Sequence, residues 1–161
     1  MDGSTPLQVV VLVRHGDAMS KEEDPRRPLS AIGHEHVEKV AGLVAGIGLK
    51  LEEVRHSGKE RARETAEIFA ERVGVTPDRI REASGLNPKD DVQVIAEQLE
   101  TEGRSVALVG HLPFMGLLAS RLLSGDAERV QFRFQDAGCL LVTRVERGWR
   151  LDGFVNHELL P

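Results

Sequence analysis

The chain is 161 residues long, and its 40% hydrophobic and 29% charged residues are typical of one globular domain with its own core. A net charge of −5 argues against nucleic acids and anionic membranes as partners. No apolar run reaches the roughly 20 residues that cross a bilayer, and the first residues lack the basic and apolar regions of a secretory signal. We therefore expect a single cytoplasmic domain over residues 1–161.

The first part of the chain predicts a buried strand, a loop and a helix. Leu7–Val13 is almost continuously apolar and rich in valine, which is typical of a strand covered on both faces. The polar, proline-containing segment 20–28 is expected to be a loop, and Ser30 is a good N-cap for the helix that follows. Gly46 and Gly48 are expected to end that helix.

The middle of the chain continues this alternation. A short strand is expected around Val54, and apolar residues at helical spacing predict helices over 62–73 and 92–99. Val106–Val109 is a second buried strand, and it leads into a helix that contains residues 114–118.

The end of the chain predicts an antiparallel hairpin. Cys139–Val145 and Trp149–Val155 flank Arg147 and Gly148, which favour a tight turn. Cys139 is the single cysteine and is expected to be a buried apolar residue, not a reactive thiol. Strands that alternate with helices indicate an α/β protein of three layers, in which helices cover both faces of a mainly parallel mixed sheet.

Three polar clusters follow predicted strands. They are Arg14–Gly16, His56–Gly58 with Arg61 and Arg63 just beyond it, and Gly110–His111. Ligands of such sheets bind beyond the carboxyl ends of the strands, where these clusters would meet. Two histidines and at least two arginines in one place indicate an anionic ligand. Phosphate fits the planar fork of arginine and the backbone N–H groups of helix N-termini.

The residue types also indicate phosphoryl transfer. His15 would attack phosphorus in line while His111 donates a hydrogen bond to a phosphoryl oxygen, and arginines would neutralise charge in the transition state. Gly16, without a side chain, would let the backbone approach the oxyanion. Each part alone has a simpler explanation, with His111 as a core or cap residue and with Arg61 and Arg63 as solvated helix surface. The prediction therefore depends on their joint placement.

Short motifs are spread over nearly the whole chain. They are Val13–Ala18, Arg27–Ser30 with Gly33, Ser57 through Arg61 and Ala62 to Thr65, Leu86–Pro88, and Gly110–Pro113 followed by Gly116. In this order and at these separations they resemble the histidine phosphatase superfamily, whose fold is called phosphoglycerate mutase-like. Within that superfamily they resemble the small phosphohistidine phosphatases of the SixA type.

The resemblance implies that His15 is a nucleophile that becomes transiently phosphorylated and is then freed by water. The residues it implies are Arg14, His15, Arg61 and His111 for catalysis, and Gly16, Arg27 and Ser57 for substrate binding. Arg63 has no counterpart in the family and is expected on the helix surface. The family uses no metal, and neither a metal nor another cofactor is expected here.

Two positions depart from the family pattern. Gly58 stands where a proline often follows the serine, and this is expected to loosen the turn before Arg61. Gly110 stands where a serine is common before the second histidine, so a hydrogen bond near the phosphate would be lost. Both changes bear on turnover rate more than on the type of reaction.

The general acid is the one catalytic group without a motif. Asp17, Asp90 and Asp91 are the candidates by position, each with solvated surface as the simpler explanation, and solvent itself is the alternative. An alkoxide needs a proton from a positioned donor, whereas the imidazole of phosphohistidine leaves more readily. This favours phosphohistidine in a signalling or phosphotransfer protein as the substrate.

Two other functions stay open. One is a phosphatase of small phosphate esters, such as a sugar phosphate or a nucleotide, and the other is a non-catalytic module that binds phosphorylated partners. Binding alone requires the arginines but no nucleophile, so the presence of both His15 and His111 favours an enzyme.

Overall fold

The computed structural model describes residues 6–161, and the first five residues, which contribute to the expectation that a secretory signal is absent, lie outside it. The strands are β1 (Val9–Arg14), β2 (Glu53–His56), β3 (Ile80–Glu82), β4 (Val106–Gly110), β5 (Cys139–Val145) and β6 (Gly148–Val155). The helices are α1 (Ala31–Ile47), α2 (Glu60–Val73), α3 (Val92–Glu102) and α4 (Phe114–Ser124), with short 3-10 helices η1 (Pro77–Arg79) and η2 (His157–Leu159). Among the described residues, no helix is long and apolar enough to span a bilayer.

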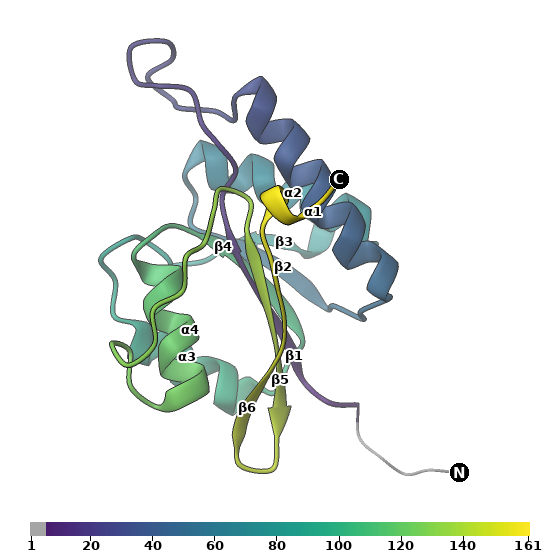
Figure 1. Cartoon of the computed structure of the whole chain (residues 1–161), viewed down its shortest axis with the longest axis vertical. Coiled ribbons are helices and arrows are strands. Elements are labelled where there is room, and N and C mark those ends of the chain that lie inside the picture. The colour runs from purple at the N-terminus through teal and green to yellow at the C-terminus, as the bar shows by residue number, and fades with distance from the viewer. Residues whose placement is uncertain (1–5) are drawn as a thin grey trace.

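One mixed sheet of six strands runs through the molecule in the order β3-β2-β4-β1-β5-β6 (Figure 1). The strands β3, β2, β4 and β1 are parallel, whereas β5 is antiparallel to both of its neighbours, β1 and β6. The predicted α/β fold with a mainly parallel sheet and a C-terminal hairpin is therefore confirmed.

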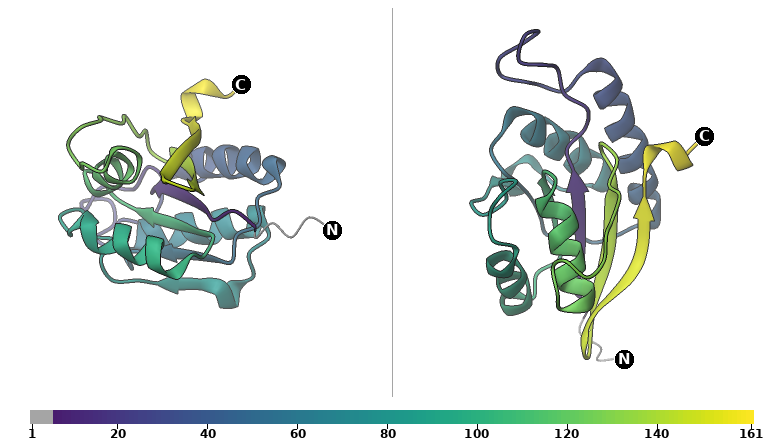
Figure 2. Two further views of the ribbon diagram at one scale, coloured as in Figure 1. Left: turned by 90° about the horizontal axis from the view of Figure 1, so that it is seen from below. Right: turned by 60° about the vertical axis from the view of Figure 1, so that its left-hand side comes forward.

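Helices cover both faces of the sheet, with α1 and α2 on one face and α3 and α4 on the other (Figure 2). The strand β1 shows why its sequence is continuously apolar. Val11 and Val13 belong to the core beneath α1 and α2, while Val10 and Leu12 belong to the core beneath α3 and α4. Successive side chains of a strand point to opposite faces, so a strand between two helical layers is apolar at every position.

The ends of the elements differ from the sequence predictions in a few places. Ser30 caps α1 as expected, because its hydroxyl accepts a hydrogen bond from the Gly33 N–H at 3.0 Å. The helix continues through Gly46 and ends at Gly48, whose φ of 78° is left-handed, so the expectation that Gly46 helps to end it is wrong. The sequence does not indicate β3, because its three residues are mostly exposed and form no apolar run.

The parallel strands bring the three polar clusters to one edge of the sheet. Arg14 is opposite Gly110 in the register of β1 and β4, and His56 is opposite Val109 in the register of β2 and β4. The carboxyl ends of these strands are therefore neighbours, as are the residues that follow them.

Candidate active site

Two histidines meet at the ends of β1 and β4. The backbone N–H of His15 donates to the carbonyl of Gly110 at 2.9 Å, which extends the pairing of the two strands. The rings of His15 and His111 lie 4.9 Å apart between their centroids and are tilted by 57°. The two histidines that the sequence predicts to act on one phosphoryl group are thus neighbours in space.

The ring of His15 has a defined tautomer. Its Nδ1 lies 2.7 Å from the carbonyl oxygen of Gly16, and because a carbonyl only accepts hydrogen bonds, Nδ1 carries the proton. Burial lowers the pKa of His15 to about 4, against the opposing effect of this hydrogen bond. The positive charges of Arg61, Arg14 and Arg27 lower it further. At neutral pH the ring is therefore uncharged, and Nε2 holds its lone pair.

The ring of His111 is positioned by a hydrogen bond with Ser57. Only 2% of the surface of His111 is exposed, and its Nε2 lies 2.6 Å from the hydroxyl oxygen of Ser57. Burial lowers the pKa of His111 to about 3, and the charges of His15, Arg61 and Lys59 act in the same direction. In the tautomer whose Nε2 accepts from the Ser57 hydroxyl, the proton of this neutral ring is on Nδ1.

Three arginines surround the two rings without carboxylates to neutralise them. Arg14, Arg61 and Arg27 all act on His15 through their charge, and none of them forms an ion pair within residues 6–161. The Nη1 of Arg14 donates to the carbonyl of Phe134 at 2.8 Å, which fixes the guanidinium. Burial lowers the pKa of Arg61, and the nearby charge of Arg27 adds to this effect.

Several donors in this site are buried and unused. Of five buried side-chain polar atoms that lack a hydrogen-bond partner in the described residues, three belong to the site: Nε of Arg14, Nε of Arg61 and Nδ1 of His111. An unsatisfied buried polar group costs about 1–3 kcal/mol, and such groups require an explanation, of which a ligand is one. Two neutral imidazoles among three guanidinium groups favour an anionic ligand.

Comparison with known proteins relates the chain to one family. Residues 10–87 match the model of the histidine phosphatase superfamily (branch 1). The chain is 29% identical over 157 residues to the phosphohistidine phosphatase SixA of Escherichia coli (strain K12), and the match covers 94% of this chain and 93% of that protein. The chain belongs to the histidine phosphatase superfamily.

Solved structures of SixA proteins share this fold. A structure of the protein histidine phosphatase SixA in complex with tungstate has a TM-score of 0.83 and 25% identity, and covers 96% of this chain and 100% of its own. A crystal structure from Agrobacterium tumefaciens that carries the SixA name has a TM-score of 0.72 and 25% identity, and covers 92% of this chain and 97% of its own. The relationship identifies the protein as a phosphatase, a hydrolase, and leaves its substrate open.

Gly16 has a structural reason to be glycine that the sequence does not reveal. A side chain at Gly16 would place its Cβ 2.7 Å from Cγ2 of Val37 and 3.1 Å from the carbonyl oxygen of Gly33, so glycine is what allows α1 to pack here. Its N–H donates to the Thr65 hydroxyl at 3.0 Å, and that hydroxyl donates to the carbonyl of Arg61 at 2.7 Å. The Gly16 N–H is therefore committed within the protein, which leaves a role in substrate binding as a prediction only.

The two departures from the family pattern also have local causes. Gly58 has a φ of 92°, which the ring of proline cannot adopt, and a Cβ there would collide with the Glu82 carboxylate. Proline therefore does not fit this turn as it stands, and the expected looseness of the turn stays a prediction. At Gly110, a Cβ would lie 2.6 Å from Cε of Met115 and 3.2 Å from the carbonyl oxygen of Leu86, so a serine would require Met115 to move.

The three candidate acids all have hydrogen bonds elsewhere. Asp17 accepts from the hydroxyl of Ser30 at 2.6 Å, near the start of α1. Asp90 accepts a backbone N–H of its own loop at 2.8 Å, and Asp91 is the N-cap of α3 with a bond of 2.9 Å. Among the described residues, no hydrogen bond joins any of these carboxylates to His15 or His111.

A second pair of histidines lies near the first and is not indicated by the sequence. The rings of His36 and His157 are stacked, with centroids 3.5 Å apart and an angle of 9° between their planes. Nδ1 of His36 lies 2.8 Å from Oδ2 of Asp136, and Nε2 of His157 lies 3.0 Å from Oδ1 of the same carboxylate. We call these three residues the His36–Asp136–His157 cluster. Because they are far apart in the sequence and form no motif, only the folded chain reveals them.

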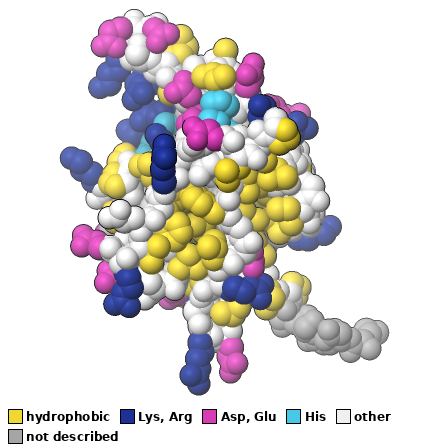
Figure 3. All heavy atoms as spheres, viewed as in Figure 1, with side chains coloured by type: hydrophobic (Ala, Val, Ile, Leu, Met, Phe, Trp, Pro, Cys, Tyr) yellow, Lys and Arg dark blue, Asp and Glu magenta, His cyan; other side chains and the backbone are white. Residues whose placement is uncertain are grey.

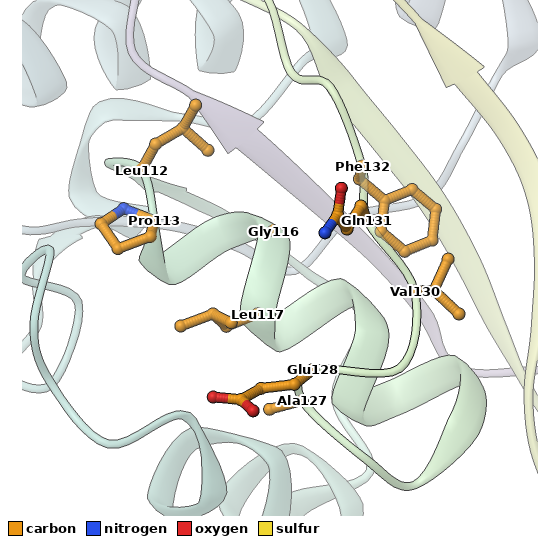
Figure 4. Close-up of a pocket in the computed structure, with 9 residues that line it drawn as sticks. All are labelled: Leu112, Pro113, Gly116, Leu117, Ala127, Glu128, Val130, Gln131 and Phe132. Carbon is orange, nitrogen blue, oxygen red and sulfur yellow. The ribbon is translucent and has the colours of Figure 1, made fainter.

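A cavity of about 560 Å³ is lined in part by Leu112 and Pro113, the two residues that follow His111 in the chain (Figure 4). It lies between the start of α4 and the segment that leads to β5, on a face where hydrophobic side chains gather (Figure 3). The residues that line it are Leu112, Pro113, Gly116, Leu117, Ala127, Glu128, Val130, Gln131 and Phe132. Most of these residues are apolar, and none of the histidines or arginines of the site is among them.

Proposed function

We propose that this phosphatase removes the phosphoryl group from phosphohistidine in another protein, with Nε2 of His15 as the nucleophile. The observation that carries the proposal is the state of the His15 ring. It is uncharged at neutral pH, its proton is held on Nδ1 by the Gly16 carbonyl, and three arginines supply positive charge around it. A neutral nitrogen with a lone pair, next to cations that attract a phosphoryl group, is the combination that attack on phosphorus requires.

The reaction proceeds in two displacements. In the first, Nε2 of His15 forms a bond to phosphorus while the P–N bond to the substrate imidazole breaks, and the departing imidazole takes a proton from solvent. In the second, water attacks phosphorus, the bond to His15 breaks and a proton returns to solvent, which leaves inorganic phosphate and the neutral ring. Arg14 and Arg61 stabilise the phosphoryl oxygens, and Nδ1–H of His111 donates to one of them.

The surroundings of the leaving group favour a phosphoramidate over an alkyl phosphate. Asp17, Asp90 and Asp91 are occupied by hydrogen bonds to neighbouring groups. An alkoxide leaving group needs a positioned acid, whereas the imidazole of phosphohistidine can take its proton from water. Phosphate esters of sugars or nucleotides are therefore the second choice of substrate.

The partner we propose is a phosphorylated signalling or phosphotransfer protein in the cytoplasm. The cavity lined by Leu112 and Pro113, the two residues that follow His111, is the surface that we expect such a protein to contact (Figure 4). The SixA relative is named as a phosphohistidine phosphatase, and a SixA structure holds tungstate, a tetrahedral oxyanion like phosphate.

The decisive experiment compares substrates and variants side by side. The protein is incubated with a phosphohistidine protein and with a panel of small phosphate esters that includes a simple alkyl phosphate, and released phosphate is measured. We expect a higher kcat/KM for phosphohistidine, and we expect His15→Ala to lower it by about 10³-fold or more. A phosphorylated form of the enzyme should be trapped with the parent protein and not with His15→Ala.

The matched control is His34→Ala, because His34 is an exposed histidine on α1 outside the site. It should retain parental activity. Equal rates for His15→Ala and the parent protein would contradict the nucleophile, and a clear preference for the alkyl phosphate would contradict the substrate.

A further inference from the structure

The His36–Asp136–His157 cluster is a set of metal-ligating side chains outside the phosphate site. His36 lies on α1, Asp136 in the segment before β5, and His157 in η2 at the end of the chain. One ligand atom from each residue lies within 4.8 Å of those of the other two. Their side chains are 15–21% exposed, so the cluster is formed by folding yet is reachable from solvent.

The ligand atoms of this cluster lie close to the spacing that a bound ion requires. Imidazole nitrogens and carboxylate oxygens lie about 2.0–2.2 Å from ions such as Zn²⁺. Two ligand atoms about 2.1 Å from an ion lie about 3.4 Å apart at the tetrahedral angles of zinc and about 3.0 Å apart at the right angles of octahedral coordination. The observed distances from the carboxylate of Asp136 to His36 and His157 are 2.8 and 3.0 Å. The fold thus gathers the ligand atoms, and binding of an ion requires the stacked rings of His36 and His157 to turn until the lone pairs of both point at it.

The donor atoms and their charges suit a divalent transition metal. Two imidazoles and one carboxylate form a ligand set found for zinc and for non-haem iron, with the remaining positions left to water. Asp136 is a carboxylate at neutral pH, and the two histidines are its only ion-pair partners in the part of the chain that the structure describes. The backbone N–H of Asp17 donates to Oδ2 of Asp136 at 3.1 Å, which orients the carboxylate as an outer hydrogen bond does in metal sites.

We propose that His36, Asp136 and His157 bind one divalent transition-metal ion of the Zn²⁺ class. Binding of the ion would replace the two hydrogen bonds between Asp136 and the histidines with three coordination bonds. It would thereby join α1 to the C-terminal η2. It would also fix the segment next to the phosphate site, because the N–H of Ala137 donates to the carbonyl of His15 at 3.1 Å. The site is distinct from the proposed phosphatase reaction, in which no metal takes part.

Binding of Co²⁺ and Zn²⁺ to the full chain, freed of metal by a chelator, tests this site. Co²⁺ should give a visible absorption band that saturates at one ion per chain, and Zn²⁺ should abolish the band by competition. Zn²⁺ should also raise the melting temperature, as any ligand of the folded state does. Asp136→Asn and His157→Gln should each weaken the affinity by about tenfold or more.

Two controls separate this cluster from the other histidines. His34→Gln removes an exposed histidine from the same helix, and His15→Gln removes one from the phosphate site; both should bind Co²⁺ as the parent does. In the parent protein, paramagnetic Co²⁺ should broaden the ring signals of His36 and His157 before those of His111, a measurement that does not depend on whether a variant folds. Saturation below one ion per chain, binding that survives Asp136→Asn and His157→Gln, or broadening of His111 first would overturn the proposal. The phosphatase assay is independent of each of these outcomes.

Discussion

Two pairs of histidines both contact the segment before β5, the first through Ala137 and the second through Asp136, and they differ in what surrounds them. The rings of His15 and His111 are tilted and 4.9 Å apart among arginines, whereas those of His36 and His157 are stacked 3.5 Å apart on the carboxylate of Asp136. The first pair has unused donors and positive charge around it. The second has its polar atoms directed at one negative group.

The neighbours of an imidazole, not the imidazole itself, decide its chemistry. Burial and nearby cations keep a ring neutral, and the cations attract an anion, which makes a nucleophile for phosphorus. A shared carboxylate instead draws positive charge, whether a proton or a metal ion. A histidine count of the sequence would treat the two pairs alike.

After loss of His15 itself, the largest effect is expected from removing a cation next to the first pair. Arg61→Gln should lower kcat/KM for phosphohistidine by about 10²–10³-fold, because a preorganised charge that stabilises the transition state is lost. Steady-state release of phosphate measures it.

The matched control lies two residues further along α2. Arg63 forms ion pairs with Glu60 and Glu67, so it is a surface cation whose charge is already neutralised. Arg63→Gln should stay within about twofold of the parent. Similar losses for both variants would mean that net charge, not position, attracts the substrate.

Acid should destabilise the folded protein because it favours protonation of His15 and His111, which are uncharged in the fold. The pKa of His15 is about 4 in the folded protein and 6.5 as its reference value, so the unfolded state binds more protons between these values. The free energy of unfolding should therefore fall as the pH is lowered from about 6.5 to about 4, by about 3 kcal/mol from His15. Urea unfolding at a series of pH values gives the slope.

The variant His15→Gln should reduce that slope without removing it, because the pKa of His111 is lowered in the same direction. Above pH 6.5 the two proteins should show the same dependence on pH. Parallel curves across the whole range would show that His15 does not resist protonation in the folded state.

The smallest of these effects is expected at Ser57. Its hydroxyl holds Nε2 of His111 at 2.6 Å, so Ser57→Ala removes one hydrogen bond, worth about 1 kcal/mol, and lowers kcat by about fivefold. Because Ser57 positions another residue, KM should change less than kcat, and Ser57→Thr should restore most of the rate. A change in KM alone would instead assign Ser57 to substrate binding.

The sequence predicts the parts that depend on local pattern. The continuous apolar run of β1 indicates a strand between two layers, Ser30 indicates the start of α1, and the polar groups after each parallel strand indicate where the site forms. These features follow from periodicity, capping and the direction of parallel strands. The family motifs then predict which residues gather there.

What the sequence does not predict depends on contacts between distant segments. The short edge strand β3 has no apolar pattern of its own and forms by pairing with β2. Gly16 must be glycine because Val37 on α1 occupies the space of a side chain. At Gly58, the carboxylate of Glu82 occupies the space that a side chain would need. The second histidine pair joins three segments that no spacing rule connects.

The hydroxyl of Thr65 links two segments of the candidate site, the loop after β1 and the helix α2. It accepts from the N–H of Gly16, next to the proposed nucleophile His15, and donates to the carbonyl of Arg61, the proposed phosphate-binding cation. The loop after β1 and the helix α2 are thus joined through one buried side chain. Nucleophile and cation are then set relative to each other before any substrate arrives. Their alignment is part of the folding of the protein, and little reorganisation is left for the moment of binding.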